Sequence, residues 1–476
     1  MSDRQRNFRY LVLDWIFSLL AWNLFYLFRY QELGAQTGFS SLQAYLFHGK
    51  ALLLDVLIPC FWILLSALSG YYHQPRKKSI GGDVLHSLII CVLGSLAIFF
   101  TVIINDLPEN YTQYYQLFIA IFVCQFLLML LPRCLLTSAK NRQHLLGKSG
   151  IRTIVIGSGE KAHRLKNEYQ RRLRSNDDLI VGYIALENES LQQNDSPHIP
   201  ANEILGSMED LPDIIQKEKI EHIIIAGDFS KEEEQQKIID KLYCHRLEMH
   251  LFSGSKQAFG KDISLSSVSG IPLIRLTPAG MQAWEMNMKR ICDIFISILG
   301  LICLSPLLLF LMLRVKMDSK GPIFFTQERL GKDAKTFRII KFRTMRTDAE
   351  AEGPQLSSVN DSRITKFGAI MRRYRLDELP QLLNVIKGEM SLVGPRPERA
   401  YYAKQILQQA PHYELIYQVR PGITSLGMAK FGYANTVEKM IERLDYDIIY
   451  LKQASLLMDI KILVFTIKPV LSGSGL

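Results

Sequence analysis

The 476-residue sequence predicts a membrane protein with both α and α/β regions. Hydrophobic residues make up 48% of the chain, and they are concentrated in blocks near the length that crosses a bilayer. Strand and helix patterns alternate after residue 150, which indicates an α/β domain. A further apolar block near residue 300 has basic residues on both sides. We therefore expect three parts: a four-helix transmembrane domain (1–140), a small α/β domain (141–275) and a C-terminal α/β domain (285–476).

Four apolar segments predict the transmembrane helices, at residues 11–28, 52–68, 84–104 and 117–131. Arg4, Arg6 and Arg9 precede the first segment. The loop between the third and fourth contains Asp106 and Glu109 but no Lys or Arg. By the positive-inside rule, we expect both ends of the chain in the cytoplasm.

Two carboxylates, Asp14 and Asp55, fall within or at the edge of the first two segments, where a charge is costly. They could form a lipid-headgroup or proton site. The alternative is a structural role, at the interface or bonded to a neighbouring helix.

The net charge of +10 suits anionic lipid or phosphorylated substrates, and no recognition motif for nucleic acid is present. The seven cysteines are scattered and show no ligand spacing for zinc.

Residues 151–156 read as a strand, followed by a turn with Gly157, Gly159 and Ala162 and then a helix. Further strands are expected at 179–186, 222–226 and 249–252, which predicts a small doubly wound, Rossmann-like domain. The glycine spacing leaves two functions open. The domain could bind a nucleotide or nucleotide sugar, or it could be a degenerate copy used for regulation or assembly.

The fifth apolar segment, 291–313, carries Ser305-Pro306 in its middle, and proline favours a kink or break. Basic residues flank both of its ends: Lys289, Arg290, Arg314 and Lys316. Because the positive-inside rule places both ends on one face, we expect a re-entrant membrane helix. The alternative is a kinked fifth span, which would place the rest of the chain outside the cell.

The C-terminal part contains the adjacent carboxylates Asp377 and Glu378, which we expect on a helix. Arg372 precedes this pair, and Arg396 follows it in a Pro-Arg-Pro turn. One carboxylate could attack as a nucleophile while the other holds a divalent cation. Cations around them suit an anionic substrate and phosphoryl transfer.

Several motifs from Lys289 to the C-terminus occur in the order typical of one family: KFRTM, DSRITKFGAIMRR, LDELPQLLNVIKGEMSLVGPRP and VRPGIT. In these motifs the chain resembles the bacterial sugar transferases, the polyprenyl-phosphate sugar-1-phosphate transferases. Its first two parts resemble those of the large members that start exopolysaccharide, capsule or O-antigen synthesis in the bacterial inner membrane.

The resemblance implies a ping-pong reaction between a UDP-sugar, such as UDP-glucose or UDP-galactose, and undecaprenyl phosphate. Asp377 matches the nucleophile, which would release UMP and carry an aspartyl phosphosugar. Glu378 matches the partner carboxylate, which would bind Mg²⁺.

Other residues match the family by position. Arg372 and Arg396 would hold substrate phosphates, and Ser305-Pro306 matches the break of the membrane hairpin. Lys341 and Asp459 fall in matched motifs and are further candidates for substrate binding. A homodimer is a further expectation, based on the extra surface of the first two parts.

The chain departs from the family pattern after Gly422, where Ser425 and Lys430 appear and where Tyr433 and Asn435 could supply polar contacts. This departure leaves the identity of the sugar open. Two other functions remain as alternatives: a membrane-anchored nucleotide-sugar dehydratase, and an inactive scaffold for polysaccharide assembly. The dehydratase lacks support, because no second glycine fingerprint follows Lys289.

Overall fold

The computed structural model describes residues 3–33, 41–73, 78–106, 110–145, 150–171, 178–186, 199–229, 232–252, 273–277, 280–347, 349, 361–432 and 434–473. Two compact units are present. One comprises Met1–Thr153 and Asn167–Val181, and the other comprises Ile154–Lys166 and Gly182–Leu476. Their boundary runs through the α/β region, so the three-part division expected from the sequence stays a prediction.

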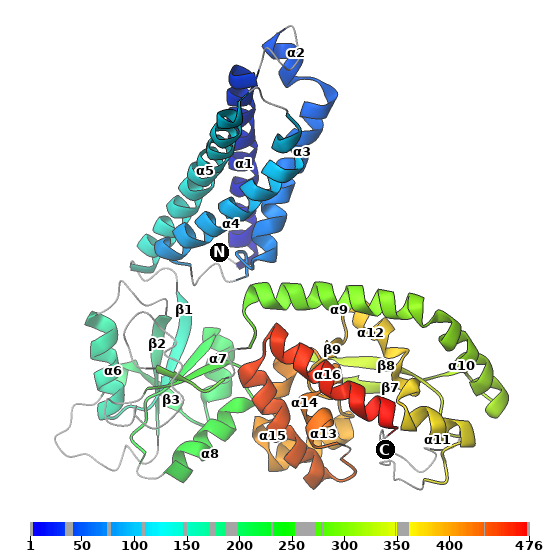
Figure 1. Cartoon of the computed structure of the whole chain (residues 1–476). Helices are drawn as coiled ribbons and strands as arrows, with labels where there is room; N and C mark the ends of the chain where they lie inside the picture. Colours follow the sequence, from blue (N-terminus) through cyan, green and yellow to red (C-terminus); the bar gives the residue numbers. More distant parts are fainter. Residues whose placement is uncertain are drawn as a thin grey trace. The chain divides into compact units, whose positions relative to one another are not determined.

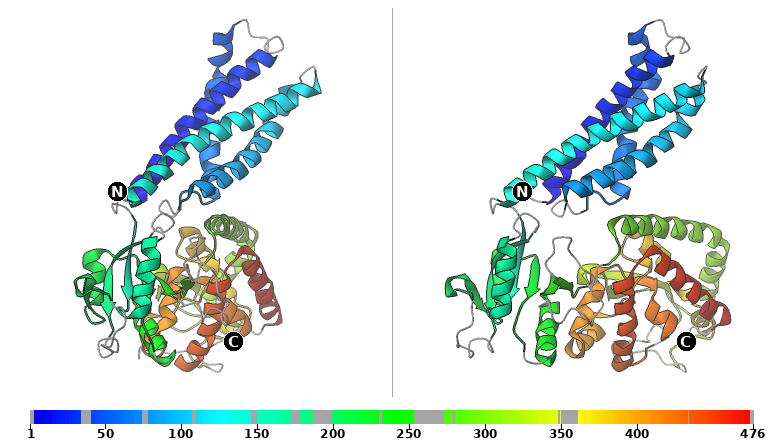
Figure 2. Two further views of the ribbon diagram at one scale, coloured as in Figure 1. Left: turned by 90° about the vertical axis from the view of Figure 1, so that its left-hand side faces the viewer. Right: turned by 60° about the vertical axis from the view of Figure 1, so that its left-hand side comes forward.

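Four long helices form the N-terminal bundle, which Figure 2 shows from two sides. They are α1 (Asp3–Leu33), α3 (Gly49–Leu68), α4 (Ile80–Thr101) and α5 (Tyr111–Leu145), with a short α2 (Leu42–Leu46) between the first two. All four are long and apolar enough to cross a membrane, which confirms the four predicted apolar helices. Leu53, Leu57 and Leu64 of α3 are more than half exposed, as expected of side chains that face lipid.

A polar cluster lies inside this bundle. Arg133 of α5 is fully buried and forms an ion pair with Asp14 of α1, with 2.7 Å between Nη2 and Oδ2. Ser66 and Ser87 accept further hydrogen bonds from Arg133, at 3.0 and 3.1 Å. Tyr72 donates to the same Oδ2 atom of Asp14 at 2.7 Å. Asp14 is therefore bonded to neighbouring helices, which is the structural role considered above.

Asp55 of α3 also has a partner on a neighbouring helix. Asn23 of α1 donates to its Oδ1 at 3.4 Å. This contact again favours a structural role over a proton site.

A six-stranded sheet forms the α/β region, with strand order β3-β2-β1-β4-β5-β6. Its strands are β1 (Ile151–Ile156), β2 (Asp178–Ala185), β3 (Ile204–Ser207), β4 (His222–Ile225), β5 (Glu248–Phe252) and β6 (Leu273–Arg275). The pairs β2–β3 and β4–β5 are parallel, whereas β6 is antiparallel to β5. Three helices belong to this region: α6 (Glu160–Arg171), α7 (Leu211–Glu218) and α8 (Glu232–Tyr243). The four predicted strands are confirmed, and β3 and β6 are additional.

The glycine turn between β1 and α6 has the backbone geometry that only glycine adopts readily. Gly157 has φ +121°, and a Cβ there would lie 2.7 Å from the carbonyl oxygen of Ala226. The Asp228 carboxylate accepts a hydrogen bond from the backbone N–H of Lys161, with 3.2 Å between N and Oδ2. A protein carboxylate thus already lies at the N-terminus of α6.

The fifth apolar segment consists of two helices, α9 (Ala283–Cys303) and α10 (Ser305–Asp318), bent by 66° at Leu304 (Figure 1). Pro306 occupies the first turn of α10, where its missing N–H costs nothing. Ser305 donates its hydroxyl to the Ile302 carbonyl at 2.7 Å, which satisfies an acceptor freed by the break. The break lies where Ser305-Pro306 predicted it.

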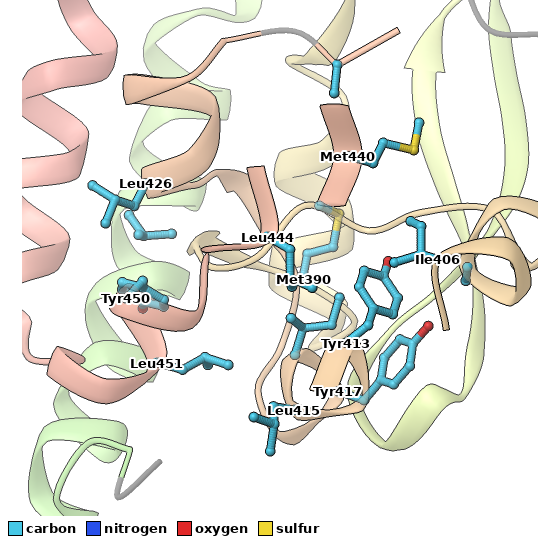
Figure 3. Packing of buried hydrophobic residues seen from close by; sticks show 14 of the residues in the cluster. Met390, Ile406, Tyr413, Leu415, Tyr417, Leu426, Met440, Leu444, Tyr450 and Leu451 are labelled. Atoms are coloured by element: carbon cyan, nitrogen blue, oxygen red, sulfur yellow. The ribbon is translucent and has the colours of Figure 1, made fainter. Parts of the chain in front are cut away.

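The rest of the chain folds around short strands and helices. The hairpin β7 (Phe324–Leu330) and β8 (Thr336–Phe342) comes first, followed by α11 (Lys366–Arg373), α12 (Gln381–Lys387), β9 (Ser391–Val393), α13 (Ala400–Gln409), β10 (Gly422–Thr424), α14 (Leu426–Lys430), α15 (Val437–Gln453) and α16 (Leu456–Ser472). Their buried core includes Met390, Ile406, Tyr413, Leu444 and Leu451 (Figure 3). This core holds together segments that are far apart in the sequence.

Strands β9 and β10 are parallel and join two glycine-containing turns. The N–H of Gly422 donates to the Pro395 carbonyl at 2.9 Å, and that of Gly394 donates to the Thr424 carbonyl at 3.0 Å. A Cβ on Gly422 would lie 2.2 Å from the nitrogen of Gly394, so only glycine fits there.

Candidate active site

Asp377 and Glu378 lie in a single 3-10 turn, Leu376–Glu378, rather than on the helix expected from the sequence. Arg375, just before the turn, has a left-handed backbone with φ +54°. A non-glycine residue in this region stores strain, which is common at functional sites. Helix α12 begins only at Gln381, so the two carboxylates are held at the junction between α11 and α12.

Glu378 is surrounded by cations from three segments. Its Oε1 lies 2.9 Å from Lys341 Nζ and 3.7 Å from Arg396 Nη2, and its Oε2 lies 3.6 Å from Arg375 Nη1. Burial of the carboxyl alone would raise its pKa. The three cations outweigh that effect and hold the pKa of Glu378 well below its usual range. Glu378 is therefore an ionised carboxylate.

Asp377 is also buried, with 7% of its surface exposed, but no ion pair joins it to a described residue. Burial raises the pKa of Asp377 to about 6, and the neighbouring charge of Glu378 adds to the rise, while Lys341 and Arg372 oppose it. The two adjacent carboxylates thus differ in pKa, as is typical of acids with different roles in one site.

The β7–β8 hairpin supplies one wall of the site. Residues directly opposite in an antiparallel pair share a face, and here Phe325 lies opposite Lys341 and Gln327 lies opposite Ile339. These four side chains, with Arg329 two residues further along β7, line one cavity. The alternation of the strands therefore places Lys341 on the cavity face.

The cavity has a volume of about 320 Å³ and contains both carboxylates in its wall. Arg372 also lines it and donates through Nε to the Thr344 hydroxyl at 2.8 Å. Its cationic lining is Arg329, Lys341, Arg343, Arg346, Arg363, Arg372, Arg375, Arg396, Arg399 and Arg443. Such a lining suits phosphate groups, because guanidinium and ammonium donors match their charge and geometry.

Glu398 was not predicted from the sequence, and it is almost fully buried in the cavity wall. It bridges two arginines: Arg443 Nη2 lies 2.7 Å from its Oε1, and Arg329 Nη1 lies 3.2 Å from its Oε2. Burial raises the pKa of this carboxyl, but Arg443 and Arg329 lower it by a larger amount. The pKa of Glu398 is therefore below its usual value. The only available sequence signal was the position of Glu398 directly after the Pro-Arg-Pro turn.

The structure thus brings together Asp377, Glu378, Lys341, Arg372 and Arg396 in one cavity wall. Two other predicted sites lie elsewhere. Asp459 is not among the cavity-lining residues; it accepts a hydrogen bond from Tyr450 at 2.8 Å and forms an ion pair with Lys289. Ser305-Pro306 lies at the helix break, and its role there is structural.

The segment that departs from the family pattern has structural contacts of its own. Ser425 caps α14 by accepting from the N–H of Met428 at 3.0 Å, and the Lys430 ammonium lies 4.1 Å from the Phe465 ring centre. Asn435 is exposed, and Tyr433 lies outside the described residues. Ala434, between them, lines the cavity.

Among the described side chains, no group of three or more His, Cys, Asp or Glu could hold a metal ion by itself. Mg²⁺ typically binds one or two protein carboxylates and completes its shell with water and substrate phosphates. The carboxylates in the cavity wall are Asp377, Glu378 and Glu398.

A cation-lined cavity around two carboxylates of different pKa suits anionic, phosphorylated substrates. Sequence comparison gives the family. Residues 284–473 match the model of the bacterial sugar transferases, and residues 67–251 match a model described as a CoA-binding domain. The chain belongs to the bacterial sugar transferase family.

Individual relatives agree with this assignment. An exopolysaccharide production protein, PSS, from Rhizobium leguminosarum is 41% identical over 198 residues, which cover 40% of this chain and 99% of the relative. The UDP-glucose:undecaprenyl-phosphate glucose-1-phosphate transferase of Escherichia coli is 31% identical over 289 residues, or 60% of this chain and 62% of the relative. A UDP-N-acetylgalactosamine-undecaprenyl-phosphate N-acetylgalactosaminephosphotransferase of Aeromonas hydrophila is 39% identical over 200 residues, or 42% and 47%. The aligned parts thus span less than two thirds of these last two relatives.

Proposed function

We propose that this protein transfers a sugar 1-phosphate from a UDP-sugar to undecaprenyl phosphate, giving undecaprenyl-diphospho-sugar and UMP. The observation that carries the proposal is the Asp377-Glu378 pair, buried in a cavity with cations on its walls. The printed activities of the relatives from E. coli and A. hydrophila support it.

Asp377 is the nucleophile in this proposal. A carboxylate oxygen of Asp377 attacks the phosphorus linked to the sugar, and the bond from that phosphorus to the bridging oxygen of UMP breaks. Lys341, Arg372 and Arg396 stabilise the charge on the phosphate oxygens. A phosphate oxygen of undecaprenyl phosphate then attacks the same phosphorus, which breaks its bond to Asp377 and restores the free carboxylate.

Glu378, together with substrate phosphate oxygens, would hold Mg²⁺, which supplies charge neutralisation during phosphoryl transfer. Within the protein, Lys341 keeps the Glu378 carboxylate in place through its 2.9 Å contact. The same contact ties β8 to the turn that carries Asp377.

We propose that α9 and α10 form a re-entrant hairpin in the bacterial inner membrane, with the catalytic region on the cytoplasmic face. The 66° bend and the basic residues at both ends of the pair support this topology. A cytoplasmic cavity also has access to nucleotide sugars.

For the Rossmann-like region we propose a role in regulation or assembly, including a homodimer, rather than dinucleotide binding. Asp228 at the N-terminus of α6 places a negative charge where a bound phosphate would lie. The similarity to a CoA-binding domain keeps binding of a nucleotide-containing ligand as the competing function.

The test is UMP release by membranes that contain the wild type or Asp377→Asn, given undecaprenyl phosphate, Mg²⁺ and a panel of UDP-sugars. The panel includes the UDP derivatives of glucose, galactose and N-acetylgalactosamine. We expect the wild type to release UMP from one of these donors, and we expect the variant to lose that release. Equal release by the variant would overturn the assignment of the nucleophile. No release from any donor by folded wild type would instead favour an inactive scaffold.

A further inference from the structure

The cavity that contains the two carboxylates has an apolar portion that the proposed phosphate chemistry does not use. Phe324 and Phe325 line it and are 37% and 39% exposed, and Pro322 lies beside them. Phe324 stacks on Phe342 across the hairpin, with 5.5 Å between ring centres. Phenylalanine rings in contact with water are costly, and a group of them in a binding cavity indicates an apolar ligand.

The hairpin fixes the order of these features along the cavity. Phe325 lies directly opposite Lys341, whose ammonium contacts Glu378. Arg329, which forms an ion pair with Glu398, lies four residues further along β7. At the rise per residue of a strand, this spacing corresponds to about 13 Å. The apolar rings and the Arg329–Glu398 contact therefore lie at different ends of the cavity wall, with Lys341 at the apolar end.

The apolar end is continuous with the bent helix pair. Leu308, Leu311 and Val315 of α10 pack in one buried cluster with Phe342, and Ile323 packs against that cluster. Only five residues separate the end of α10 from Phe324. The rings are thus linked to the apolar cluster of α10 through Phe342, which belongs to that cluster and stacks on Phe324.

We infer that Phe324 and Phe325 bind the first isoprene units of the polyprenyl acceptor, while its phosphate lies at Lys341 and Arg372. This inference rests on the proposed function and adds the site that selects the lipid tail. The cavity wall formed by the β7–β8 hairpin changes from cationic to aromatic side chains. It therefore matches a ligand with an anionic head group and a branched hydrocarbon chain. The uridine of the donor would then extend toward Arg329.

The experiment compares two acceptors, undecaprenyl phosphate and the short, soluble farnesyl phosphate, with full-length protein in detergent. We expect the variant Phe324→Ala/Phe325→Ala to raise the KM for undecaprenyl phosphate by about tenfold, since it removes apolar contact area. The KM for farnesyl phosphate should rise by a similar factor, because it also carries the first isoprene units, which contact the rings. Thermal unfolding of the variant in detergent should match that of the wild type, which shows that the variant is folded.

The matched control is Ile449→Ala, because Ile449 is 44% exposed on α15 and does not line the cavity. We expect wild-type constants for both acceptors in this control. If the two phenylalanines only anchor the protein in bulk lipid, the KM for the soluble farnesyl phosphate would stay at its wild-type value while that for undecaprenyl phosphate rose, and this result would overturn the inference. Wild-type constants for both acceptors in the phenylalanine variant would overturn it too. Absence of UMP release in the wild type would contradict the proposed function itself.

Discussion

Two regions of this molecule bury carboxylates among cations, and they do so in different ways. In the helical bundle, Asp14 is paired with Arg133, and serine and tyrosine hydroxyls bind the remaining polar atoms. In the catalytic region, Glu378 contacts several cations, including Lys341, whereas Asp377 has no ion pair with a described residue. The first cluster is internally satisfied, and the second lines a cavity.

The difference shows that a buried charge is not by itself a functional site. A satisfied pair such as Asp14–Arg133 connects helices and leaves no donor or acceptor for a ligand. A carboxylate that has no ion pair and that borders a cavity is able to react with a bound substrate. Each experiment below tests one side of this contrast.

The largest effect is expected from Asp377→Asn. Loss of the nucleophile should reduce UMP release by at least about 10⁴-fold. Because burial favours the neutral form of this side chain, the variant should unfold at the same temperature as the wild type or higher. A large drop in the melting temperature would instead mean that the Asp377 charge stabilises the fold, as in the bundle.

In the bundle, Arg133→Met should lower the free energy of unfolding by about 3–5 kcal/mol, because it leaves Asp14 buried without a countercharge. The double variant Asp14→Leu/Arg133→Met should recover most of that loss. Thermal unfolding in detergent measures both. If the double variant is as unstable as Arg133→Met, the loss of stability does not come from the unpaired charge of Asp14.

The pH dependence of UMP release should follow Asp377. Its pKa is raised to about 6, so the protonated, unreactive form persists to a higher pH than for an ordinary aspartate. Below this pH, kcat/KM should fall about tenfold per pH unit. Glu378 stays ionised in that range because its pKa is lowered. A profile that stays flat down to about pH 4, the ordinary aspartate value, would contradict this picture.

Glu398→Gln should lower kcat/KM by about tenfold, since the orientation of Arg329 and Arg443 depends on both carboxylate oxygens. The effect should appear mainly in the KM for the UDP-sugar, as measured by initial rates at saturating acceptor. If kcat alone fell, with KM unchanged, Glu398 would act on the reacting atoms rather than position the arginines.

The smallest effect is expected at Arg246, whose Nε lies 2.7 Å from Glu414 at an exposed position. Arg246→Ala should change the free energy of unfolding by no more than about 1 kcal/mol. Arg164→Ala, which removes an exposed pair with Glu160 on α6, is the matched control. A clearly larger loss for Arg246→Ala would show that this contact couples the α/β region to the catalytic region.

Local patterns allowed much of the fold to be predicted. Runs of apolar residues located the four spans, and Ser305-Pro306 located the break between α9 and α10. The helices extend beyond the predicted limits, as in α5 (Tyr111–Leu145), which continues past Pro132 into polar sequence. Short strands such as β3 and β6 were missed, since three or four residues carry too little periodicity.

The site was predicted where its residues fall in motifs that resemble the family. Lys341, Arg372, Asp377, Glu378 and Arg396 lie in such motifs, whereas the Arg443–Glu398 contact joins residues 45 positions apart. The partner of Asp14 is 119 positions away, and no local pattern indicates it. The 3-10 turn was also missed, because its two carboxylates suit the first turn of an ordinary helix.

The close pairing of β9 with β10 has a consequence for how this chain can change. The Pro-Arg-Pro turn that carries Arg396 and the Gly422 segment are joined by reciprocal backbone hydrogen bonds, with no room for a Cβ between them. Neither segment can therefore be grafted from another protein without the other. In a chimaera built to alter the sugar, residues 394–397 and 420–424 would have to be exchanged as one cassette.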